Sequence, residues 1–176
     1  HTSMDVKAFS SLVRDIQLLL TFDRDGSGTL DVDELGPALR QLGLTNVSDR
    51  HCKAILRTWD ADKSGRLDLL EFTDLVRSLQ TFMKFDKNNS GDIDVDELRP
   101  ALRRLGLPAD TEAANSILMW YDADDSGCIE LHEFAMLARD IQVFRAFDAD
   151  ESGYLDAKEL LPALSKLGLA TNSKEV

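Results

Sequence analysis

The chain has 176 residues, of which 43% are hydrophobic, and this is enough apolar material for one or two small domains. A formal net charge of −12 at pH 7 argues against nucleic acid as a partner and against electrostatic attachment to an anionic membrane. Neither a signal peptide nor an apolar run of about 18 residues is present, so no transmembrane segment is expected.

The chain opens with a short segment before its first predicted helix. Residues 1–3 precede Met4 and are interpreted as the remnant of an expression tag. Residues 4–10 match the end of the helices that follow later loops of the chain. We therefore expect the sequence either to be a segment of a longer protein or to have degenerate ends.

The first candidate site is the twelve-residue segment 23–34, DRDGSGTLDVDE, with oxygen-bearing side chains at positions 1, 3, 5, 9 and 12. Calcium is a hard cation that takes six to eight oxygen ligands, and a loop of this pattern wraps one ion. Gly28 at position 6 allows the sharp turn, and the carbonyl of position 7 completes the set. The predicted ligands of this loop are Asp23, Asp25, Ser27, Thr29 through its carbonyl, Asp31 and Glu34, which supplies both carboxylate oxygens.

The same pattern returns in four further loops, at 60–71, 86–97, 122–133 and 148–159. One such copy is often only a turn, but five complete copies, each with glutamate at position 12, favour calcium sites. Magnesium is expected as a competitor. The predicted ligands of these loops are Asp60, Asp62, Ser64, Arg66, Asp68 and Glu71; Asp86, Asn88, Ser90, Asp92, Asp94 and Glu97; Asp122, Asp124, Ser126, Cys128, Glu130 and Glu133; and Asp148, Asp150, Ser152, Tyr154, Asp156 and Glu159.

The spacing of the loops predicts how they are connected. Successive loops start 37, 26, 36 and 26 residues apart. The shorter spacing leaves only residues 72–85 and 134–147 between loops, and neither segment contains glycine or proline. Each segment therefore predicts a single helix shared by two loops, so those two loops cannot pair with each other.

The predicted fold is all-α, with tandem helix–loop–helix units that we call hands. The first loop is expected to pair with the second and the third with the fourth, which leaves the fifth unpaired. The apolar residue at position 8 of each loop should face the core and bridge to the partner loop; these residues are Leu30, Leu67, Ile93, Ile129 and Leu155. The predicted domains are residues 4–79 for the first pair with its N-terminal helix, 72–142 for the second pair and 134–170 for the fifth hand.

Cysteine and histidine usage gives no sign of a disulfide framework or of catalysis. Cys52 and Cys128 lie in different settings, which favours a reducing, cytoplasmic environment. The three histidines His1, His51 and His132 are scattered, and no nucleophile–base arrangement is visible. The chain itself is not expected to be an enzyme.

With these five loops, the chain resembles the EF-hand superfamily over nearly its full length. Its organisation is most similar to the penta-EF-hand group, which includes sorcin and the calpain calcium-binding domains. That resemblance implies a homodimer formed through the fifth hand, 148–159. Two features depart from that group: the shared helices are shorter, and the fifth loop has a full ligand set. A missing sixth hand is therefore an alternative explanation for the odd number of hands.

Three functional hypotheses follow. The first is a calcium-responsive interaction or regulatory module that acts on a protein or peptide partner or on an intramolecular target. Binding surfaces that adapt to many partners tend to be rich in methionine, and this chain has only four methionines. A specific partner is therefore favoured over promiscuous binding. The alternatives are a calcium buffer, which five intact sites favour, and a calcium-regulatory domain of a larger enzyme, which the calpain resemblance implies.

Overall fold

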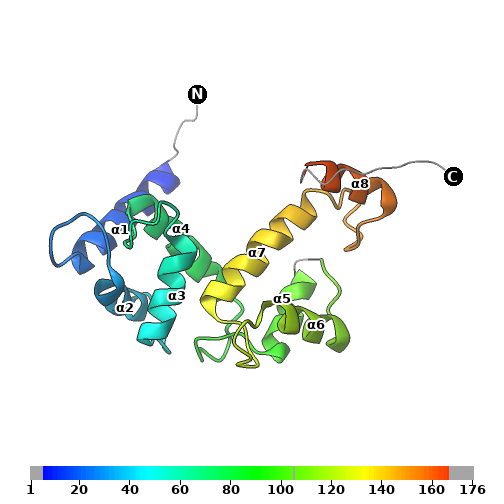
Figure 1. The fold of residues 1–176 in the computed structure, drawn as a ribbon, viewed down its shortest axis with the longest axis horizontal. Coiled ribbons are helices and arrows are strands. Elements are labelled where there is room, and N and C mark those ends of the chain that lie inside the picture. The colour runs from blue at the N-terminus through cyan, green and yellow to red at the C-terminus, as the bar shows by residue number, and fades with distance from the viewer. Residues whose placement is uncertain (1–5, 105, 167–176) are drawn as a thin grey trace.

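The computed structural model describes residues 6–104 and 106–166, and their regular structure is helical apart from two isolated bridges (Figure 1). In these residues the expected all-α fold of tandem hands is confirmed. The helices are α1 (Val6–Phe22), α2 (Val32–Gln41), α3 (Asp49–Trp59), α4 (Leu69–Phe82), α5 (Val95–Arg104), α6 (Thr111–Tyr121), α7 (Leu131–Arg145) and α8 (Ala157–Lys166).

The two isolated bridges pair the loops as the spacing predicted. Leu30 and Leu67 exchange backbone hydrogen bonds of 2.9 and 2.8 Å, and Ile93 and Ile129 do the same at 2.9 and 2.8 Å. All four side chains are fully buried. The prediction was wrong for Leu155, which is only half-buried and forms no bridge within the described residues, because no second loop there faces it.

The shared helices are present, but they begin three residues earlier than predicted. Helix α4 starts at Leu69 and ends at Phe82, and α7 runs over Leu131–Arg145, instead of 72–85 and 134–147. In α4, Asp68 is the N-cap and Glu71 closes a capping box, so the last three loop residues already form the first helical turn. The 14 residues of α4 make a rod about 21 Å long.

The two pairs differ in how closely their helices pack. In the first pair, α1 packs against α2 and α4, and α3 packs against the same two helices. In the second pair, α5 packs against α6, and α7 packs against α4 and α6, but no Cα atom of α4 lies within 8 Å of one of α5. The third hand, formed by α4, its loop and α5, is therefore more open than the first.

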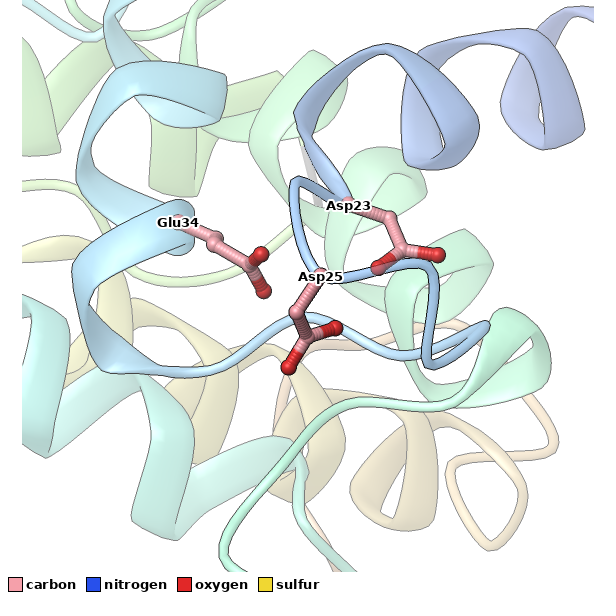
Figure 2. Close-up of side chains that lie close together, drawn as sticks. All are labelled: Asp23, Asp25 and Glu34. Carbon is pink, nitrogen blue, oxygen red and sulfur yellow. The ribbon is translucent and has the colours of Figure 1, made fainter.

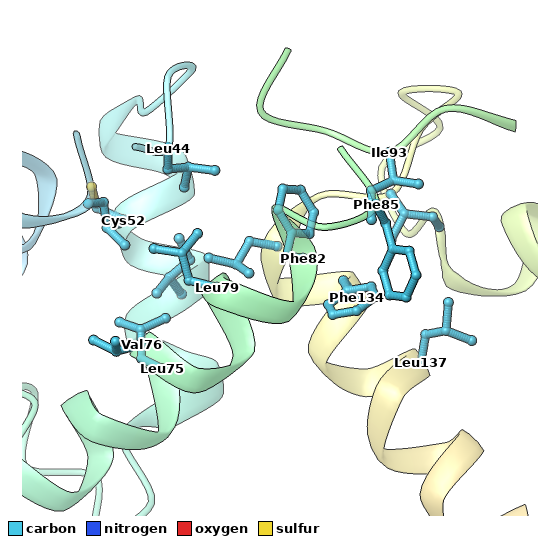
Figure 3. Close-up of a cluster of buried hydrophobic side chains, with 14 of the residues drawn as sticks. Leu44, Cys52, Leu75, Val76, Leu79, Phe82, Phe85, Ile93, Phe134 and Leu137 are labelled. Atoms are coloured by element: carbon cyan, nitrogen blue, oxygen red, sulfur yellow. The ribbon is translucent and has the colours of Figure 1, made fainter. Parts of the chain in front are cut away.

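A continuous hydrophobic core joins the two pairs (Figure 3). The Phe134 ring of α7 lies 5.6 Å from Phe82 at the end of α4 and 5.9 Å from Phe85, measured between ring centroids. Helix α7 also packs against α3 and then leads to the fifth hand (Figure 1). None of the described helices is long and apolar enough to cross a membrane.

Candidate metal sites

The first loop brings three carboxylates together at one point (Figure 2). Asp23, Asp25 and Glu34 each place a ligand atom within 4.8 Å of the others. The second, fourth and fifth loops form the same cluster from positions 1, 3 and 12. In the third loop, the Asn88 amide stands at position 3 in place of a carboxylate.

Backbone amides hold the position-1 aspartate in place. The amide of Ser27 donates to Asp23 Oδ1 at 3.0 Å and that of Gly28 to Asp23 Oδ2 at 2.8 Å. The Ser27 amide also donates to Asp25 Oδ1 at 2.9 Å. Equivalent bonds recur in the other four loops. The backbone of each loop thus holds these side chains in a defined orientation.

The carbonyl of position 7 also faces the ligand cluster. In every loop the serine at position 5 donates its hydroxyl to this carbonyl, at 3.0 to 3.3 Å. The serine oxygen and the carbonyl oxygen therefore lie side by side next to the carboxylates. Their assignment as ligands stays a prediction.

The glutamate at position 12 ties the two ends of each loop together. One carboxylate oxygen accepts the amide of position 2 at 2.7–2.8 Å, and the other accepts the amide of position 9 at 2.9–3.4 Å. Glu133 is fully buried, and this burial raises its pKa. A divalent cation would compensate such a buried charge, and the oxygen-only donor sets fit a hard ion such as calcium.

Arg66 has a contact that the sequence reasoning missed. Its carbonyl belongs to the second loop, but its guanidinium lies on the first. It donates to Asp25 Oδ2 at 3.1 Å from both terminal nitrogens and to Ser27 Oγ at 2.8 Å. Hydrogen bonds from Ser27 and from Arg66 lower the pKa of Asp25 to about 2. A cation at position 7, next to the residue that bridges two loops, is the sequence signal for this contact.

A second cross-contact joins the first pair to the fourth loop. Arg50 at the start of α3 forms an ion pair with Asp124, the position-3 ligand of that loop. The neighbouring His51 places Nε2 3.2 Å from Glu130 Oε1, and His132 places Nδ1 3.3 Å from Glu130 Oε2. The start of α3 therefore touches two predicted ligands of the fourth loop.

Family models match most of the chain. A model described as an EF-hand domain pair matches residues 16–77 and again residues 78–139. A second, described as an EF-hand domain, matches residues 139–168. These matches cover all five predicted loops.

Named relatives share this region at moderate identity. The human mitochondrial adenyl nucleotide antiporter SLC25A24 is 34% identical over 122 residues, which are 66% of this chain and 25% of that protein. Peflin of Danio rerio is 29% identical over 143 residues, 78% of this chain and 53% of peflin. The chain spans about a quarter of the length of the antiporters that it matches.

A solved structure has the same fold along nearly the whole chain. It is a homolog of programmed cell death 6 protein from Leishmania major Friedlin, and it covers 95% of this chain and 100% of its own. The TM-score is 0.59 at 20% sequence identity, a level of similarity that concerns the fold alone.

Proposed function

The chain belongs to the EF-hand family, and on that premise we propose that it is a calcium-responsive interaction module that binds up to five calcium ions. The observation that carries the proposal is the geometry shared by all five loops, in which fixed carboxylates, a serine hydroxyl and a carbonyl converge. We assign the ligands to positions 1, 3, 5, 7, 9 and 12 of each loop, as in the sequence analysis. Loops of this kind bind calcium at about 10⁻⁷–10⁻⁵ M, and magnesium competes for them.

The open third hand supplies a surface for a partner. A cavity of about 210 Å³ lies between the end of α4, α5 and α7, and its lining includes Phe85, Leu98, Leu102 and Ile141. Arg145 also lines it, so an apolar segment with a neighbouring acidic group would fit. The fixed position-12 carboxylate at the start of α5 links the third site to one wall of this cavity, which supports calcium control of the partner site.

The fifth hand supports a second kind of contact. Within the described residues its loop has no pairing partner, and Leu160 and Leu161 of α8 are 42% and 48% exposed. We propose that it pairs with a hand of a second copy, as the resemblance to penta-EF-hand proteins implies. The three domain ranges predicted from the sequence are retained in this proposal.

A calcium-regulatory domain of a larger protein is the second candidate function. This candidate is favoured by how little of a longer relative the chain matches. The chain matches calcium-dependent protein kinase 2 of Zea mays over only 26% of that protein's length. We propose no catalytic role for the chain itself. A reducing, cytoplasmic location fits Cys52 and Cys128, which are free cysteines.

Calorimetric calcium titration of the metal-stripped chain, with an apolar fluorescent dye in a parallel sample, tests the proposal. We expect about five equivalents of calcium and a rise in dye fluorescence as calcium stabilises the open form of the third hand. The variant Glu97→Gln should abolish the dye response, whereas the matched variant Glu159→Gln should preserve it. Uptake of two equivalents or fewer would contradict calcium binding as proposed, and full uptake without a dye response would favour a buffer.

A further inference from the structure

The first site carries a cation supplied by its own partner loop, Arg66, whereas the arginine on the fourth site, Arg50, comes from helix α3. The guanidinium of Arg66 bonds to Asp25 and Ser27, and it lies 3.6 Å from Asp31 Oδ2. These are three of the predicted ligands of the first loop. No ion pair reaches a ligand of the second, third or fifth loop from the residues that the structure describes.

The geometry shows that Arg66 uses oxygens that a calcium ion would need. Both terminal nitrogens of Arg66 bond to Asp25 Oδ2, while Asp25 Oδ1 accepts the Ser27 amide. Both carboxylate oxygens of Asp25 thus accept hydrogen bonds from the chain itself. Calcium at the first site must either displace the guanidinium or lie next to a positive charge, and both reduce its affinity.

The second pair provides an internal comparison. Cys128 occupies the same position of the fourth loop as Arg66 does of the second, and it carries no positive charge. In the third loop, which faces Cys128, Asn88 stands where the first loop has Asp25. In the first pair, the arginine at position 7 therefore faces an aspartate at position 3. In the second pair, a neutral cysteine at position 7 faces an asparagine at position 3.

We propose that Arg66 is an internal counter-ion that competes with calcium for the first site and lowers its affinity relative to a pair without that arginine. The inference rests on the proposed calcium site in the first loop and adds a residue that sets its affinity. The guanidinium balances part of the carboxylate charge while the site is free. When calcium enters, the guanidinium leaves Asp25, so ion uptake at this site includes the release of a side chain from the neighbouring loop.

The experiment compares the full chain with the variant Arg66→Cys, which gives the first pair the residue found in the second. The matched control is Arg57→Cys, which removes the same charge from the exposed last turn of α3. The amide resonances of the position-6 glycines, such as Gly28 and Gly127, report each loop separately because each amide donates to its position-1 aspartate. Calcium is added at low ionic strength and again at high salt.

We expect Arg66→Cys to lower the half-saturating calcium concentration at Gly28 by a factor of about two to five, the range typical of an exposed ion pair. Gly127 should titrate as in the unaltered chain, and high salt should reduce the difference at Gly28. An unchanged Gly28 titration, or an equal change with Arg57→Cys, would overturn the role of Arg66 while leaving calcium binding intact. A Gly28 resonance that does not change with added calcium in any variant would instead contradict calcium binding by the first loop.

Discussion

Phe134 joins the two loop pairs, and removing its ring should weaken one pair much more than the other. The side chain is 4% exposed and packs against Phe82 and Phe85. The replacement Phe134→Ala should cost about 3–5 kcal/mol, the range for deleting a buried phenylalanine ring. The first pair forms a different part of the continuous core, in which Phe72 holds the equivalent place after its loop and is fully buried. The loss should therefore concentrate in the second pair.

Hydrogen exchange of the bridge amides measures each pair separately. The amides of Leu30 and Leu67 are protected by the first bridge, and those of Ile93 and Ile129 by the second. In calcium-saturated Phe134→Ala, the second set should lose about two to three and a half orders of magnitude of protection, since each 1.4 kcal/mol is a factor of ten. The first set should lose less than about one order.

The variant Phe72→Ala is the matched control, because it deletes the same ring from the first pair. It should reverse the pattern, with the larger loss at Leu30 and Leu67. Equal losses at all four amides in Phe134→Ala would show that the two pairs open as one unit, and this would refute the reasoning that each part of the core stabilises its own pair.

Three further predictions concern single residues. Burial, together with a hydrogen bond to Asp140, raises the pKa of Tyr121 to about 12. This value lies above the ordinary tyrosine pKa of about 10. The contribution of the protonated hydroxyl to folding stability should therefore be complete below about pH 10 and be lost as the pH rises toward 12. In an ultraviolet pH titration, Tyr121→Phe should remove the tyrosine ionisation near pH 12. The change Asn88→Asp adds a carboxylate to the third loop and should tighten its calcium binding in calorimetry; an unchanged affinity would argue against ligand charge as the controlling factor. Glu133→Gln should remove one equivalent of calcium uptake, since it neutralises the buried position-12 ligand of the fourth loop, and undiminished uptake would contradict that assignment.

The sequence predicted the loops and their pairing because both depend on short patterns and on spacing. The limits of α4 were missed by three residues, although the Asp68–Glu71 capping box that sets its start can be read from the sequence. Leu155 was expected to face the core from the position-8 pattern alone, but the burial of that position depends on a second loop, and the fifth loop was itself expected to be unpaired. Arg66 was missed because its side chain crosses to residues about 40 positions away, and a cation at position 7 indicates that contact only once the pairing of the two loops is taken into account.

The sharing of α4 and α7 has a mechanical consequence. Helix α4 ends one hand and starts the next, so no flexible linker can absorb a change in its direction. A tilt of about 10° would move the far end of this 14-residue rod by nearly 4 Å. Each pair therefore inherits its orientation from the preceding one, and calcium uptake should alter the curvature of the whole chain, which small-angle X-ray scattering would detect as a change in its radius of gyration.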